Sequence, residues 1–197
     1  MDRSCLTDEL IKFDPSKPMA SVPIQIIVTL AIMILSNILF RLFLKLWPNT
    51  IYNDMYDDRV QEYTSLENKQ IGVLAFATSE ILNGSLYAPV AEELFFRFFL
   101  FKTVFVAKLN MNPHMANLLQ ATIFGGLHLT NTIYSEQVTR MSVIQSFSSA
   151  IIGLLSGYAY MYTNSILPAT FAHILNNVNA TVIEIGRFNT HINDEDE

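Results

Sequence analysis

Two long stretches of this chain carry no charged residue, and they limit its fold more than any other feature. Neither 21–40 nor 141–183 contains an Asp, Glu, Lys or Arg residue. One bilayer crossing takes about 20 apolar residues. Backbone polar groups in hydrocarbon must be satisfied within the chain, and a single apolar segment achieves this as a helix. The sequence therefore predicts an all-α, polytopic bundle of helices in a membrane.

The overall composition supports this class and excludes others. Hydrophobic residues make up 51% of the chain and charged residues 15%, which is unusual for a soluble globular protein of this size. No block of basic residues is present, so nucleic acid is not an expected partner. The single cysteine, Cys5, cannot form an internal disulfide and is not expected to be a catalytic thiol. The first twenty residues lack the apolar core of a signal peptide, so we expect the first hydrophobic span to direct its own insertion.

Hydropathy and charge divide the chain into five regions. We expect a polar N-terminal segment (1–20), a first transmembrane helix (21–47), an aqueous loop (48–70), a helical core that would carry the site (71–186) and an acidic C-terminal tail (187–197). The apolar segments add up to about six membrane helices. Charges in the loops are balanced, so the sequence sets no orientation in the bilayer.

The first part of the core is too long for a single crossing. As one helix, Ile71–Leu109 would span roughly 58 Å. Asn83-Gly84-Ser85 and Pro89 offer a break, so we expect one element over Ile71–Leu86 and a second from Pro89, because proline fits a first helical turn. Further helices are expected over three apolar segments: Met115–Leu129, Met141–Tyr162 and Ser165–Ile185.

Three charged residues lie close together inside this apolar core, where they would span about one and a half turns of a helix. Ionised side chains at the centre of a membrane helix cost roughly 2.5–3.5 kcal/mol each, so Glu92, Glu93 and Arg97 need compensation. Glu93 and Arg97 are four residues apart, which places them within about 40° of each other in the order that favours an ion pair. Glu92 points about 100° away from Glu93. It lacks that partner, so it can face a cavity and act as a general base.

Two histidines occur at helical spacing in later apolar segments. His128 ends the run Phe124-Gly125-Gly126-Leu127-His128, whose glycines allow close helix approach. His173 and Asn177 are four apart and share one face, where an imidazole and an amide can hold an oxyanion. Each residue alone has an ordinary explanation as a contact between helices. Together, on three separate elements, the acid, the imidazoles and the amide favour a site that activates water in low-dielectric surroundings.

These residues resemble the three motifs of the CPBP family. That family contains the type II CaaX prenyl endopeptidases and the bacteriocin-processing or self-immunity proteins. The motifs occur in order on separate apolar segments: Glu92-Glu93-x-x-x-Arg97, Phe124-x-x-x-His128 and His173-x-x-x-Asn177. The resemblance covers roughly Ile71–Ile185, well over half of the chain.

The resemblance implies a helical intramembrane endopeptidase with a defined set of site residues. Glu92 would activate the attacking water, and His128 would help to position it. His173 and Asn177 would stabilise the tetrahedral oxyanion. Three further residues would support the site: Glu93, Arg97 and Phe124. Family members often have glycine where this chain has Phe98, so we expect a narrower site or altered helix packing there.

The sequence leaves the cofactor open between two alternatives. Glu92, His128 and His173 form a His₂Glu set, which is a composition found at catalytic zinc sites. No H-E-x-x-H motif is present, and a His173 that works with Asn177 on an oxyanion is not free to bind a metal. We therefore favour a glutamate mechanism that requires no cofactor and retain a divalent metal such as zinc as the alternative.

Two functions outside proteolysis are the alternatives to an endopeptidase. One is a membrane adaptor or immunity protein in which the motif residues only pack helices. The other, ranked lower, is an ion or proton transporter, since intramembrane Glu and His residues can form relays. The implied partners are membrane lipid and a peptide or protein substrate, lipidated if it is of the CaaX type. The sequence defines neither the oligomeric state nor the membrane in which the protein resides.

Overall fold

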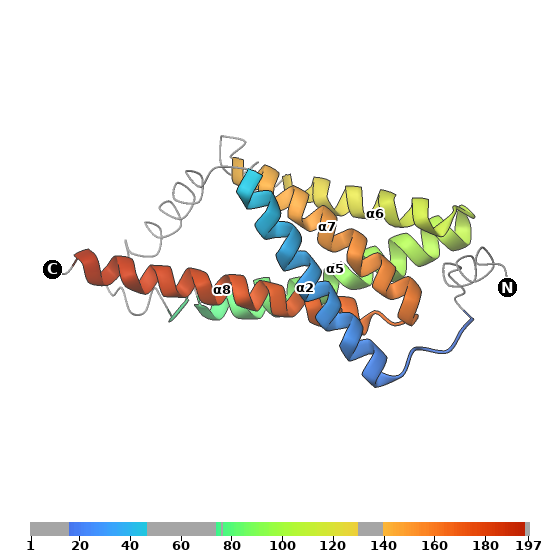
Figure 1. Ribbon diagram of the computed structural model, residues 1–197, viewed down its shortest axis with the longest axis horizontal. Coiled ribbons are helices and arrows are strands. Elements are labelled where there is room, and N and C mark those ends of the chain that lie inside the picture. The colour runs from blue at the N-terminus through green and yellow to red at the C-terminus, as the bar shows by residue number, and fades with distance from the viewer. Residues whose placement is uncertain (1–15, 47–73, 76, 130–139, 196–197) are drawn as a thin grey trace.

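The computed structural model describes residues 16–46, 74–75, 77–129 and 140–195, and every regular element in these ranges is a helix (Figure 1). The predicted all-α fold is therefore confirmed. Most of the predicted N-terminal segment and the aqueous loop 48–70 lie outside the described residues. The elements are α2 (Val22–Leu46), η2 (Glu80–Tyr87), α5 (Ala88–Glu93), η3 (Leu94–Lys108), α6 (Pro113–His128), α7 (Arg140–Thr163) and α8 (Leu167–Glu195).

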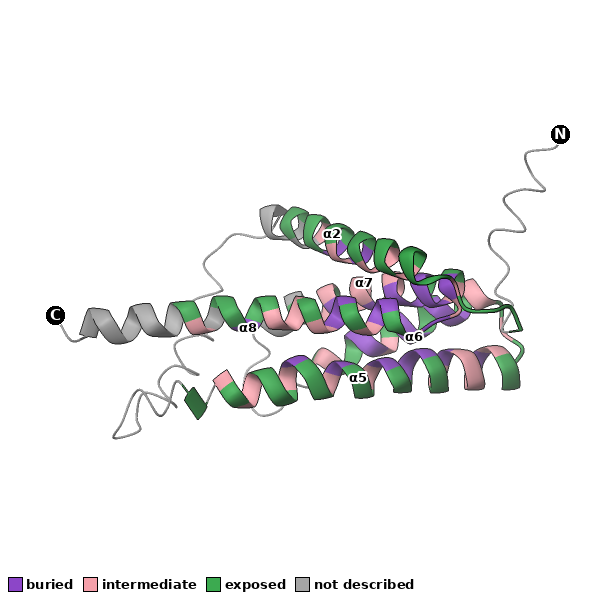
Figure 2. Cartoon of the chain, turned by 90° about the horizontal axis from the view of Figure 1, so that it is seen from below, coloured by how far each residue is buried: buried purple, intermediate pink, exposed green. Residues whose placement is uncertain are grey.

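Helix α2 is apolar on its exposed side as well as on its packed side. Ile32 packs with Ala159 of α7 and Ala172 of α8. Large apolar residues between Val22 and Leu42 are exposed, and most of the described part of α2 has the colour of exposed residues in Figure 2. Within the described residues, one helical stretch is long and apolar enough to cross a membrane, Val22–Leu39. Exposed apolar surface of this extent calls for lipid or another apolar partner. The total of about six membrane segments remains a prediction.

The predicted break between residues 83 and 89 is wrong. Elements η2, α5 and η3 follow one another directly, and the junction residues Ala88 and Leu94 keep right-handed helical dihedrals. Both η segments are π-helical, and the Ala88 N–H donates to the carbonyl of Asn83, five residues earlier. Local π geometry is one way in which a membrane helix accommodates glycine and proline. The helix can therefore continue through Gly84 and Pro89.

Helices α6 and α7 approach each other closely at Gly125. A methyl group on Gly125 would lie 2.6 Å from the Ser146 carbonyl oxygen and 2.7 Å from Ala150 Cβ. A methyl group on Gly126 would contact only the neighbouring backbone of α6 itself. No other atom of the described residues would lie within 4 Å of it. The close approach that we predicted from both glycines therefore depends on Gly125 and not on Gly126.

These neighbouring glycines give a matched test of helix packing. We expect Gly125→Ala to destabilise the protein by about 1–3 kcal/mol, because the contact is with the α7 backbone, which cannot rotate away. Gly126→Ala should be neutral or stabilising by up to about 1 kcal/mol, because alanine is the better helix former. Thermal unfolding of the purified variants in detergent measures the difference. Equal melting temperatures would contradict the packing described here.

A tight turn joins α7 to α8 at the predicted split. Asn164 has a φ of 49°, in the left-handed region that asparagine tolerates better than most residues. Helix α8 then continues through Glu195, so most of the range predicted as a separate tail is helical. The range 187–195 contains no proline or glycine that would end the helix.

An aromatic core fixes η3 against α6 and α7. Phe101 and Phe105 of η3 pack with Ala116 of α6 and Tyr160 of α7. The rings of Phe101 and Tyr160 meet edge to face, with centroids 6.0 Å apart. The buried face of this part of η3 is apolar. The buried charged residues lie at the opposite end, where η3 joins α5.

Candidate active site

A buried ion pair anchors the site at the junction of α5 and η3. The side chains of Glu93 and Arg97 are both 0% exposed, and Arg97 Nε lies 2.9 Å from Glu93 Oε2. The pair has the i, i+4 spacing from which we predicted it. A buried charge is stable only when paired and hydrogen-bonded, so each of these residues depends on the other.

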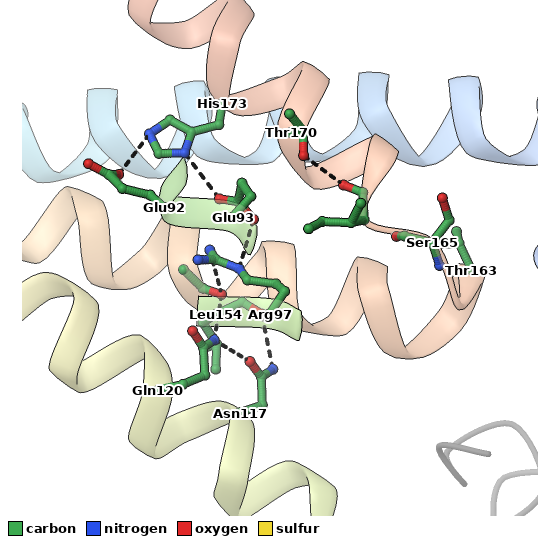
Figure 3. Close-up of polar contacts among 12 residues, drawn as sticks. Glu92, Glu93, Arg97, Asn117, Gln120, Leu154, Thr163, Ser165, Thr170 and His173 are labelled. Carbon is green, nitrogen blue, oxygen red and sulfur yellow. Dashed lines mark hydrogen bonds and ion pairs between the residues drawn. The ribbon is translucent and has the colours of Figure 1, made fainter. Parts of the chain in front are cut away.

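His173 of α8 lies between the two adjacent carboxylates (Figure 3). Its Nδ1 is 3.0 Å from Glu93 Oε1, and its Nε2 is 3.8 Å from Glu92 Oε2. The first distance is a hydrogen bond, whereas the second is too long for one. Glu93 is fully buried, but the Glu92 side chain is 34% exposed. The two neighbouring glutamates therefore differ: Glu93 is fixed inside the bundle, and Glu92 remains accessible beside the imidazole.

Hydrogen bonding assigns a proton to Nδ1 of both histidines. The Glu93 carboxylate, which pairs with the Arg97 guanidinium, accepts from His173 Nδ1 at 3.0 Å. The carbonyl oxygen of Phe124 accepts from His128 Nδ1 at 2.8 Å. Neither oxygen can donate, so each Nδ1 carries the proton. In a neutral ring, Nε2 is then left as an acceptor, and in His173 this nitrogen is the one beside Glu92.

The Phe124 ring connects the ion pair to the two histidines. It is 1% exposed, and the Arg97 guanidinium carbon lies 5.0 Å from its centroid. Its centroid lies 4.8 Å from that of His128 and 5.9 Å from that of His173, both edge to face. The supporting position predicted for Phe124 therefore has a physical basis in packing. His128 reaches the cluster through this ring.

Helix α8 runs antiparallel to α5 and η2 and is joined to them by polar contacts. Asn177 Nδ2 donates to the Gly84 carbonyl oxygen at 2.9 Å. One turn further, the Ser85 and Thr181 hydroxyl oxygens lie 3.1 Å apart in a buried contact. One of the two amide hydrogens of Asn177 is thus engaged with the backbone of η2. The predicted role on an oxyanion would have to use the other one.

Sequence reasoning missed a group of amides beneath the ion pair. Gln120 Nε2 donates to Asn117 Oδ1 at 2.7 Å and to the Gly153 carbonyl oxygen at 3.0 Å, and Asn117 Nδ2 donates to the Leu154 carbonyl oxygen at 3.1 Å. Arg97 Nη2 donates to the same Gly153 oxygen at 3.4 Å, so the amides extend the ion pair into α6 and α7 (Figure 3). Two amide residues three positions apart in an otherwise apolar segment were the signal available in the sequence.

The expectation that Phe98 narrows the site is not supported. Phe98 is 53% exposed, and the Lys102 ammonium lies 5.6 Å from its ring centroid. The ring is therefore on the outer surface of η3. The neighbouring aromatic residues divide in the same way, since Phe96 is buried and Phe95 and Phe99 are exposed.

The metal alternative requires at least three ligands around one point. Within the described residues, no group of three or more His, Cys, Asp or Glu side chains is arranged to hold a metal ion. Glu92 and His173 are neighbours, whereas His128 meets the cluster through Phe124. The residues do not form a ready three-ligand set, and a role for zinc stays a prediction.

In its described residues the chain combines an all-helical fold, exposed apolar side chains and a buried Glu–Arg–His cluster, features typical of a membrane-embedded protein with an internal polar site. The family described as type II CAAX prenyl endopeptidase Rce1-like matches residues 74–179, more than half of the 197 residues. The chain belongs to this family, which confirms the resemblance read from the motifs. Members of this family are integral membrane proteins, and membership in the family implies peptidase activity. No curated protein and no solved structure matches the chain.

Proposed function

We propose that this protein is an intramembrane endopeptidase that hydrolyses a peptide bond near a prenylated CaaX-type or otherwise hydrophobic C-terminus, with a water activated by Glu92. The observation that carries the proposal is the difference between the two adjacent glutamates. Glu93 is fully buried and holds both Arg97 and His173, while Glu92 is 34% exposed beside His173 Nε2. The buried Glu93 carboxylate has a structural task, because it holds Arg97 and His173 in place. An accessible second carboxylate beside an oriented imidazole is what general-base chemistry needs.

The proposed reaction assigns one task to each side chain. Glu92 takes a proton from water, and the hydroxide oxygen bonds to the scissile carbonyl carbon. His173, held by Glu93, faces the developing oxyanion through Nε2 and donates to it in the imidazolium form. Glu92 then returns the proton to the nitrogen of the leaving peptide as the C–N bond breaks. We assign His128, whose Nε2 is an acceptor, to orient the water, as its motif implies.

A peptide panel tests the proposed activity. The purified full-length protein in lipid nanodiscs should cleave farnesylated or geranylgeranylated CaaX peptides, with the products identified by mass spectrometry. We expect the unprenylated peptide to show a kcat/KM lower by about tenfold or more, because each buried methylene of the lipid contributes roughly 0.8 kcal/mol to membrane binding.

The panel includes outcomes that count against the proposal. Cleavage of none of the peptides would favour the adaptor function. Equal cleavage with and without the prenyl group would remove the lipid from the proposed substrate. A parallel series with and without 1,10-phenanthroline tests the metal alternative, and a loss of activity that added zinc restores would replace the cofactor-free mechanism.

A further inference from the structure

A proline follows η2 at a position where the hydrogen-bond pattern of this π-helix would use a backbone N–H. In this π-helical segment the Ala88 N–H donates to the Asn83 carbonyl oxygen, five residues earlier. The next carbonyl oxygen in the same register is that of Gly84, and its partner would be the backbone nitrogen of residue 89. Residue 89 is proline, which has no N–H to donate. The register therefore leaves the Gly84 carbonyl oxygen without a backbone donor.

A side chain of α8 supplies the donor that the backbone lacks. Asn177 Nδ2 lies 2.9 Å from the Gly84 carbonyl oxygen. An unsatisfied carbonyl oxygen in apolar surroundings costs free energy comparable to a lost hydrogen bond, and neighbouring helices are a known source of replacement donors at such sites. The same stretch of α8 contacts both glutamates through His173 and contacts Ser85 through Thr181.

We propose that Asn177 is a positioning residue: its amide replaces the hydrogen bond that Pro89 cannot make and so holds the segment that ends in Glu92 against α8. Pro89 is buried in α5, three residues before Glu92. Asn177 and His173 lie one turn apart on α8, so one helix sets the positions of both the backbone leading to Glu92 and the imidazole beside it. The effect on catalysis rests on the proposed function, whereas the effect on the fold does not.

A double-mutant cycle between residues 89 and 177 tests this proposal in the full-length protein. Pro89→Ala restores a backbone N–H that can reach the Gly84 oxygen. We expect Asn177→Ala alone to lower kcat by about tenfold with little change in KM, because the base is displaced and not removed. We expect Pro89→Ala alone to stay within about threefold of the wild type, and Pro89→Ala/Asn177→Ala to match Pro89→Ala within about threefold.

The neighbouring asparagine provides the matched control. Asn176 Nδ2 lies 3.4 Å from Ser36 Oγ of α2, away from Gly84. We expect Asn176→Ala to have the same effect in the wild-type and Pro89→Ala backgrounds. If Asn177→Ala lowered kcat equally in the wild-type and Pro89→Ala backgrounds, the proposal would be overturned and Asn177 would be a direct oxyanion donor.

Melting temperatures of the same variants separate this inference from the proposed function. If the wild type cleaves no peptide, the proposed function fails, but the unfolding cycle still decides whether Asn177 replaces the missing N–H. Recovery of the melting temperature in the double variant supports the replacement, as does folding of the double variant where Asn177→Ala alone does not fold. An equal loss of melting temperature in both backgrounds overturns it.

Discussion

Replacing Glu92 with glutamine will lower kcat by about 10²- to 10⁴-fold, the usual contribution of a positioned general base, and leave the melting temperature close to that of the wild type. Glutamine keeps the shape of the side chain but cannot take a proton from water. The Glu92 carboxylate is partly exposed and lies 3.8 Å from His173 Nε2, too far for a hydrogen bond. Little folding free energy therefore depends on it.

The adjacent glutamate is the matched comparison for this prediction. Glu93→Gln removes the charge that pairs with Arg97 at 2.9 Å and accepts from His173 at 3.0 Å. We expect it to lower both the melting temperature and the activity. Cleavage by Glu92→Gln at the wild-type rate would show that the base lies elsewhere. Unfolding of Glu92→Gln would instead show that Glu92 is structural.

Replacing Arg97 with methionine will destabilise the protein by about 3–5 kcal/mol, the usual cost of removing one partner from a buried pair. Arg97 is fully buried against Glu93, donates to the Gly153 carbonyl oxygen, and lies over the Phe124 ring. Methionine fills much of the volume but leaves the Glu93 charge without its main partner. Unfolding monitored in detergent micelles measures the loss.

Two further variants make the Arg97 result interpretable. Lys108→Met removes an exposed positive charge from the same η3 segment and should change stability by less than about 0.5 kcal/mol. Glu93→Gln/Arg97→Met removes both charges, so its cost should be smaller than the sum of the two single losses. A cost for Arg97→Met near that of Lys108→Met would mean that the pair does not support the fold.

The two adjacent glutamates show which features of the site follow from spacing along one helix and which require the tertiary structure. Spacing alone identified Glu93 as the partner of Arg97, because residues four apart on a helix must lie close together. Spacing also left Glu92 without that partner. It could not show that His173 would contact both carboxylates, since that contact joins residues eighty positions apart.

The sequence-based expectations that proved wrong also depended on contacts between residues far apart in the sequence. Gly84 and Pro89 are helix breakers by local propensity, yet the helix continues, with π geometry in η2 and an α8 side chain on the freed carbonyl oxygen. Gly125 and Gly126 are equivalent in the sequence, but Gly125 faces the α7 backbone, whereas Gly126 faces no other part of the chain that the structure describes. Asn117 and Gln120 lie in a segment that the sequence predicted only as an apolar helix, and they prove to extend the ion pair into α6 and α7.

The sequence by itself determined the helical class, the family and the identity of the motif residues. Each of these follows from composition, from apolar length or from spacing within one helix, all of which are local properties. The tertiary structure decided which glutamate is buried, which atoms of His173 face which carboxylate, and what Asn177 binds. These depend on the register between helices, which is set by packing over the whole bundle, and no short stretch of sequence encodes that register.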